Sequence, residues 1–132
     1  MIKFLRKDTV LTFHQDQLVL YGGKAGIRDE KLLESALAQP KAPNIGGGEH
    51  VHKDLFHMAA AYGFHLCQNH PFYDGNKRTA LIAMYTFLYV NGYQIMADKK
   101  SLFAIMMDLA QGNVSKNELR DYLKKNSKKR EK

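Results

Sequence analysis

The sequence predicts an all-α protein with a single domain. The chain has 132 residues, which is an ordinary size for one domain, and 45% of them are hydrophobic, enough for a core without covalent staples. Along most of the chain the apolar residues recur with the spacing of helices rather than with the alternation of strands. Residues that favour helix ends separate these segments, so most helix boundaries can be predicted.

Six helices and one short strand are expected. In chain order they are a strand at Ile2–Leu5 and helices at Thr9–Tyr21, Glu30–Ala38, Lys53–Gln68, Asn76–Val90, about Lys99–Gln111, and Ser115 to about Lys125. The first helix ends at Gly22 and Gly23, because glycine is a common C-terminal stop. Asp29 is a favourable N-cap for the second helix, which Pro40 and Pro43 then end.

The third and fourth helices are apolar nearly all round, which is typical of buried central helices. Asp98 is a favourable N-cap for the fifth helix, and Gly112 follows its end. Ser115 and Glu118 have the spacing of a capping box at the start of the sixth helix.

The positive charge of the chain is concentrated at its C-terminal end. Residues 124–132 hold six basic residues and one acidic residue, and so account for +5 of the net charge of +7. This pattern predicts a domain at residues 1–123 followed by a disordered basic tail at residues 124–132. No specific nucleic-acid partner is predicted, although a tail that steers the protein toward RNA or an acidic partner is an alternative.

Cysteine content and hydropathy indicate a cytoplasmic protein without a membrane partner. Cys67 is the single cysteine, so it has no partner for an internal disulfide, and it suits a reducing compartment. The longest nearly continuous apolar stretch, Ala80–Val90, is too short to span a bilayer. The first residues contain no apolar run of the length that a signal peptide needs.

Residues His70–Arg78 carry the chemistry of this chain, in the order His-Pro-Phe-Tyr-Asp-Gly-Asn-Lys-Arg. Pro71 biases His70 toward an extended backbone, so the third helix should end near Asn69. Gly75 permits a tight turn, and Asn76 is a favourable N-cap for a helix that starts around Lys77. We expect Phe72 to point inward as an anchor and Tyr73 to face outward.

The residue types in this segment match the needs of phosphate chemistry. His70 is a candidate general base, because imidazole titrates near neutral pH. Asp74 offers the hard oxygen ligand that Mg²⁺ prefers. Gly75, Asn76, Lys77 and Arg78 stand where a helix N-terminus presents free N–H groups, which predicts a phosphate-binding site. A polar turn without catalytic function is the weaker interpretation, since base, carboxylate and paired cations occur together.

The run H-x-F-x-D-G-N-K-R resembles the Fic/Doc superfamily. Its Lys-Arg ending is similar to the death-on-curing (Doc) branch rather than to the Gly-Arg ending of Fic adenylyltransferases. The resemblance extends to Leu18–Gly23, Gly26–Asp29, Leu32–Leu37 and Asn91–Gly92, and covers nearly all of the chain except the tail. It implies a compact helical fold with a short flap or β-hairpin at Pro43–His52, which aligns the target peptide by strand addition. A mobile surface loop is the alternative for this glycine-rich segment.

Two positions depart from the Fic pattern H-x-F-x-[DE]-G-N-G-R-x-x-R. Lys77 stands in place of the second glycine, and Leu81 in place of the final arginine. In the Doc branch, similar changes go with a reversed nucleotide whose γ-phosphate faces the acceptor. The resemblance therefore implies a toxin that uses ATP and Mg²⁺ to phosphorylate a Ser or Thr hydroxyl of a protein. The target of this branch is elongation factor Tu, whose modification stops translation.

The same resemblance implies the role of each residue. His70 would accept the proton of the hydroxyl, and Asp74 would hold Mg²⁺. Asn76, Lys77 and Arg78, with the N–H groups at Gly75, would neutralise charge on the transferred group. AMP transfer from the same site is the main alternative, and a non-catalytic or RNA-acting toxin is a third.

A separate inhibitor is expected as a partner. The chain contains no run of the form [ST]-x-x-x-E-[GN], which marks the inhibitory helix of many Fic enzymes. The resemblance implies instead a prevent-host-death-type antitoxin whose C-terminal segment folds onto the toxin. His14 is expected to be structural or to line the pocket, without catalytic function. The remaining histidines, His50, His52, His57 and His65, are expected to be structural rather than zinc ligands.

Overall fold

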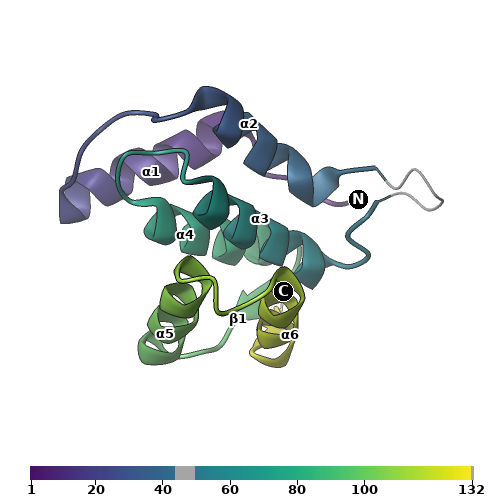
Figure 1. Ribbon diagram of the computed structural model, residues 1–132. Helices are drawn as coiled ribbons and strands as arrows, with labels where there is room; N and C mark the ends of the chain where they lie inside the picture. The colour runs from purple at the N-terminus through teal and green to yellow at the C-terminus, as the bar shows by residue number, and fades with distance from the viewer. Residues whose placement is uncertain (44–49, 132) are drawn as a thin grey trace.

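The computed structural model describes residues 1–43 and 50–131. Within these ranges the chain forms six α-helices, one 3₁₀ turn (η1) and a sheet of two short strands (Figure 1). In chain order the elements are α1 (Lys7–Tyr21), α2 (Glu30–Ala38), η1 (Gln39–Lys41), α3 (Leu55–Asn69), α4 (Asn76–Val90), β1 (Tyr93–Ile95), α5 (Lys99–Ala110), α6 (Lys116–Lys125) and β2 (Ser127–Lys129). The all-α fold class is confirmed.

Helices α3 and α4 form the centre of the molecule. Figure 1 shows α1 and α2 on one side of this pair and α5 and α6 on the other. Tyr62 of α3 and Phe87 of α4 are fully buried with their rings 5.2 Å apart. The two helices approach closely at Gly63, where a Cβ would overlap the side chain of Met84. This closely packed pair carries the residues of the predicted site at the turn between its helices.

The predicted helix caps are confirmed at three starts. Asp29 accepts a hydrogen bond from the N–H of Leu32, and Asp98 accepts one from the N–H of Ser101. Ser115 and Glu118 form the complete capping box that their spacing predicts. Each cap satisfies N–H groups that the helix itself leaves without partners. Local sequence therefore determines where these helices begin.

The predicted strand at Ile2–Leu5 is wrong. The backbone of Lys3 makes hydrogen bonds with the Asn91 side chain instead of with a neighbouring strand. Its N–H donates to Asn91 Oδ1 at 2.8 Å, and its carbonyl accepts from Asn91 Nδ2 at 2.9 Å. The N–H of Leu5 donates to the hydroxyl of Tyr62 at 2.9 Å. Side chains thus fix the first residues against α3 and α4 without a strand partner.

The expectation of a disordered tail differs from the structure. Lys124 and Lys125 belong to the last turn of α6, and Ser127–Lys129 pairs antiparallel with β1, Tyr93 opposite Lys129. Arg130 continues this attachment through its N–H, which donates to Gly92 O at 2.8 Å. The lysine-rich composition indicates solvated side chains, but the backbone of the same residues remains free to pair. The fold therefore extends to residue 130.

The predicted flap is closed at its base. Pro43 and His50 form an antiparallel bridge, and the N–H of Val51 donates to Ala42 O at 3.0 Å. The rest of the predicted flap, residues 44–49, lies outside the described residues. None of the helices in residues 1–43 and 50–131 is long and apolar enough to cross a membrane.

Candidate active site

His70 has an unusual backbone conformation. Helix α3 ends at Asn69, as predicted, but His70 is left-handed with φ 49° and ψ 54° rather than extended. Pro71 disfavours the right-handed helical region for the residue before it, and the left-handed region is the other way to leave the helix. Arg28 holds this turn: its Nε donates to His70 O at 2.7 Å, and its Nη2 donates to Asn69 O at 3.0 Å. The N–H groups of Arg28 and Asp29 donate to Pro71 O at 2.6 and 3.1 Å.

Phe72 anchors the loop, as predicted, and Tyr73 faces outward. The Phe72 side chain is fully buried and stacks on His14 with the ring centroids 3.7 Å apart. His14 is also buried, and its Nε2 lies 2.8 Å from the carbonyl oxygen of Asp74. The tautomer with hydrogen on Nε2 donates this bond. His14 thus supports the loop from beneath.

Asp74 is oriented by the loop that follows α1. Its Oδ2 accepts a hydrogen bond from the N–H of Lys24 at 2.5 Å. Gly23, with φ +122°, passes so close that a Cβ there would lie 3.1 Å from the Asp74 Cβ. One carboxylate oxygen is therefore held by backbone, and the side chain lies at the surface of the cavity.

The structure corrects the predicted role of Asn76 as an N-cap. Gly75, with φ 81°, is the N-cap residue of α4, and within residues 1–43 and 50–131 no side-chain cap bond is made at this helix start. Asn76 is the first helical residue and is buried. Its Oδ1 accepts from the N–H of Phe72 at 3.0 Å, and its Nδ2 donates to Phe72 O at 2.9 Å. The amide therefore closes the loop on itself instead of satisfying the helix end.

The second donor of the Asn76 amide faces His70. The distance from Asn76 Nδ2 to His70 Nδ1 is 3.2 Å. The two bonds to the Phe72 backbone fix which end of the amide carries the oxygen, so His70 Nδ1 must be an acceptor. A neutral His70 ring then carries its proton on Nε2.

The N-terminus of α4 has the features of the predicted phosphate site. The first N–H groups of a helix have no intrahelical partners, and here no side chain caps them. Lys77 and Arg78 are exposed on this first turn. Lys77 Nζ donates to Met107 Sδ at 3.4 Å, and the Arg78 guanidinium lies 4.3 Å above the centre of the Tyr21 ring. Both cations therefore belong to the first turn of α4, and each side chain rests on an apolar neighbour.

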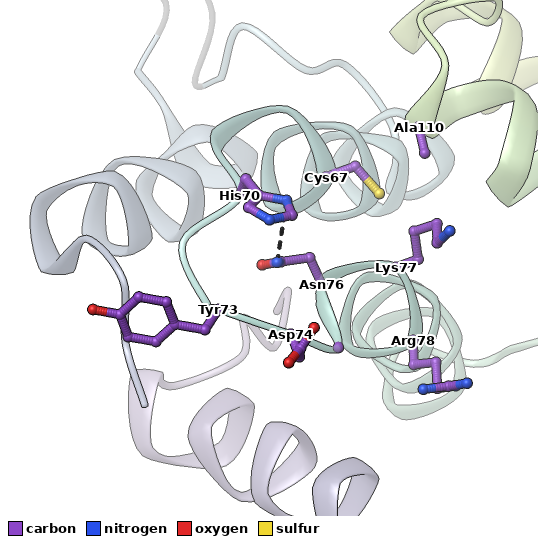
Figure 2. A pocket seen from close by; sticks show the side chains of 9 residues that line it. Cys67, His70, Tyr73, Asp74, Asn76, Lys77, Arg78 and Ala110 are labelled. Carbon is purple, nitrogen blue, oxygen red and sulfur yellow. Dashed lines mark hydrogen bonds between the residues drawn. The ribbon is translucent and has the colours of Figure 1, made fainter. Parts of the chain in front are cut away.

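All six predicted site residues line one cavity of about 450 Å³ (Figure 2). They are His70, Asp74, Gly75, Asn76, Lys77 and Arg78, joined by Cys67, Tyr73 and Ala110. Figure 2 shows Lys77 and Arg78 extending from α4 away from His70, with Asn76 between His70 and the two cations. The cavity therefore combines an imidazole, a carboxylate and the first turn of a helix with two cations.

Asp74 fits Mg²⁺ that takes its other ligands from phosphate and water. In residues 1–43 and 50–131 no three His, Cys, Asp or Glu side chains are grouped to bind a metal ion. Cys67 is a poor ligand and nucleophile, since burial raises the pKa of its thiol to about 12.

Sequence reasoning missed three backbone contacts of the site. The Arg28 side chain donates to the backbone carbonyl of His70, and the backbone N–H of Lys24 donates to the Asp74 carboxylate. The backbone of Gly23 lies close to the Asp74 side chain. The signal for Arg28 and Gly23 was the similarity of Leu18–Gly23 and Gly26–Asp29 to other Fic/Doc sequences. That similarity assigned them no partner.

Residues 4–88 of the chain match the family model described as Fic/DOC family. This protein belongs to the Fic/DOC family. A relative from Mycolicibacterium smegmatis, named Toxin Doc, is 40% identical over 98 residues, which cover 74% of this chain and 72% of the relative. A relative from Escherichia phage P1, named Protein kinase doc, is 28% identical over 124 residues, which cover 94% of this chain and 95% of the relative.

Proposed function

We propose that this protein is a Doc-type toxin that transfers the γ-phosphate of ATP to a Ser or Thr hydroxyl of a protein. The observation that carries the proposal is the shared cavity of His70, Asp74 and the uncapped N-terminus of α4 with its two cations. The two relatives, one named a toxin and the other a protein kinase, support it. Elongation factor Tu in the cytoplasm is the target we infer, which would arrest translation.

In the proposed reaction the hydroxyl oxygen of the target attacks the γ-phosphorus, and the bond to the β,γ-bridging oxygen breaks to release ADP. The hydroxyl proton passes to His70. Because Nδ1 is the unprotonated nitrogen and receives the Asn76 amide, the hydroxyl must displace that amide or meet the ring after tautomer exchange. The free N–H groups of α4, with Lys77 and Arg78, stabilise the charge on the phosphates.

Mg²⁺, when bound, neutralises phosphate charge and orients the phosphates for in-line attack. Asp74 supplies the carboxylate oxygen for this ion, and the Lys24 N–H fixes its direction. The position of Lys77 favours γ-phosphate over AMP transfer. Its side chain adds bulk and charge where a glycine would leave the backbone open to phosphate.

The decisive experiment combines the protein, Mg²⁺, elongation factor Tu and ATP labelled either at the α- or at the γ-phosphate. We expect label on the target only from γ-labelled ATP, and none with the His70→Ala variant. Label from the α-phosphate would mean AMP transfer and refute the phosphate reaction. Failure with both labels would refute this target, and the same assay in a cell lysate would then identify another acceptor.

A prevent-host-death-type antitoxin is the partner we propose for control of this activity. The relative named Toxin Doc supports such a system. Expression of this chain alone should stop growth, and co-expression of the cognate antitoxin should restore it. The His70→Ala variant should permit growth without the antitoxin, while a fully toxic variant would exclude a reaction that depends on this base.

A further inference from the structure

A second hollow lies beside the proposed active site, between α4 and α5. Its volume is about 310 Å³, at the lower end of the range for small-molecule sites. Its apolar lining comes from α4, from α5 and from the end of α1, with Leu81, Leu102, Phe103, Met106, Met107 and Tyr21. Lys77 and Arg78 border both this hollow and the active-site cavity. The two spaces therefore meet at the proposed phosphate site.

Positive charges stand around this apolar hollow. Lys77, Arg78 and Lys99 belong to its lining, and none of its described lining residues is acidic. Lys77 is placed against the sulfur of Met107, and Arg78 against the ring of Tyr21, so each cation lies over an apolar wall. This arrangement suits a ligand with a flat apolar part and an anionic part.

Along α4, the residues that border the proposed phosphate site are followed one turn later by Leu81, which lines the hollow. Arg78 and Leu81 are three residues apart, so their Cβ atoms lie roughly 5–6 Å from one another on one face of the helix. Leu81 is thus one turn beyond the free N–H groups at the start of α4. A ligand whose phosphates bind those groups can extend its other end over Leu81.

We propose that this hollow binds the purine base of a nucleotide whose phosphates lie at the N-terminus of α4. The inference rests on the proposed use of ATP and assigns a place to the base. Phe103 offers a largely exposed ring, at 69%, and Met106 and Met107 supply polarisable sulfur beside it. A purine would cover apolar surface that the fold leaves open to solvent, while the cations keep the phosphates at the other end.

The first test compares the binding of ATP with that of inorganic triphosphate by calorimetry in the presence of Mg²⁺. We expect the wild-type protein to bind ATP about tenfold more tightly, since stacking of a base on an aromatic ring contributes on that scale. Phe103→Ala should abolish most of this difference and leave triphosphate binding unchanged. The variant should fold, because the ring is exposed. Met96→Ala, an exposed apolar side chain outside the hollow, should behave as the wild type.

A second test locates the base directly. Methionine labelled with ¹³C at its methyl group gives separate NMR signals, and Met106 and Met107 are assigned by their Leu variants. ATP should shift the Met106 signal, and triphosphate should not shift it by a comparable amount; Met107 contacts Lys77, so its signal can respond to phosphate alone. An unchanged Met106 signal at saturating ATP would overturn the proposal and leave the hollow to an apolar segment of a partner protein.

The outcomes separate this inference from the proposed function. If phosphate transfer occurs but Phe103→Ala does not weaken ATP binding, the purine site is refuted and the kinase reaction remains supported. Tight, Phe103-dependent binding of ATP without any transfer would support the base site and refute the reaction. A protein that binds neither ATP nor triphosphate would refute both.

Discussion

Arg28 donates from Nε to the carbonyl oxygen of His70 at 2.7 Å, and so binds the backbone of the proposed base across 42 residues of sequence. Within residues 1–43 and 50–131, His70 is the only residue other than glycine that has a positive φ. Such a conformation costs about 1–3 kcal/mol and persists only where neighbouring groups impose it. Arg28 is one of those groups, because it also binds Asn69 O.

Replacing Arg28 by Ala should therefore slow the reaction more than it weakens nucleotide binding. A misplacement of the base by about 1 Å can cost roughly a hundredfold in rate, so we expect kcat to fall at least tenfold with little change in KM for ATP. Initial rates of label transfer measure this. Arg120→Ala is the control, since Arg120 pairs with Asp121 on the surface of α6. Equal kcat for wild type and Arg28→Ala would remove Arg28 from the positioning of His70.

The contact between Asn76 and His70 should control the pH dependence of the reaction. Asn76→Asp keeps an oxygen for the Phe72 N–H but places a carboxylate beside His70 Nδ1, where an amide donor stood. A carboxylate stabilises the imidazolium form, which cannot accept a proton. The acid limb of kcat/KM should therefore move to higher pH, with some loss of stability because Phe72 O loses its donor.

The pH profile of Asn76→Ala separates the effect of an added carboxylate from the effect of losing the hydrogen bonds to the loop. This variant also loses the bonds to the loop, so its rate should fall, but it adds no charge and its acid limb should stay near that of the wild type. If both variants shift the acid limb equally, the carboxylate is not the cause. Loss of the loop bonds would then explain the shift.

Gly23 should determine how well Asp74 serves the metal. Gly23→Ala combines a strained φ of +122° with a new Cβ only 3.1 Å from the Asp74 Cβ, so either the loop or Asp74 must move. We expect the Mg²⁺ concentration for half-maximal rate to rise about tenfold, because a carboxylate ligand is turned away. Gly22→Ala is a matched control, since it also has a positive φ, +76°, but its Cβ would meet nothing within 4 Å. Equal Mg²⁺ dependence in the two variants would refute this role.

Local signals predicted the helices and the residues of the site well. Asp29, Asp98 and Ser115 cap helices in the structure as their types and positions predict, because a cap acts within one turn. The residues that line the cavity were also predictable, since His70–Arg78 is one short segment between two buried helices. What these residues do in the reaction stays a prediction.

Contacts between distant residues could not be predicted from the same signals. Lys24 and Asp74 are 50 residues apart and meet through a backbone N–H, which any residue type could supply. The pairing of Ser127–Lys129 with β1 likewise uses backbone groups, so the charged side chains concealed it. The left-handed conformation of His70 also depends on a distant residue. Pro71 disfavours the right-handed helical conformation of His70, and Arg28, 42 residues away, stabilises the left-handed one over the extended one.

A histidine cluster between α3 and α6 should make the stability of the protein depend on pH. Lys116 Nζ lies 2.9 Å from His52 Nε2 and 3.1 Å from His65 Nε2. Burial, followed by the charge of Lys116, lowers the pKa of His52 and the pKa of His65 to about 4 each. Burial, followed by the charge of Arg120, also lowers the pKa of His57, which packs edge-on against His52.

Proton binding by the folded and unfolded states determines whether the free energy of unfolding rises or falls with pH. In the unfolded chain a histidine has a pKa of about 6.5, so between about pH 6.5 and pH 4 the unfolded state binds more protons than the folded state. The free energy of unfolding should therefore fall as the pH is lowered through this window. Thermal unfolding at pH 7, 6 and 5 measures the effect. His52→Gln combined with His65→Gln should flatten the decline, because glutamine does not titrate and its oxygen can still accept from Lys116. His50→Gln should keep the wild-type slope, since the His50 ring contacts Lys41 O instead of Lys116, and a double variant with that same slope would show that the cluster is not its source.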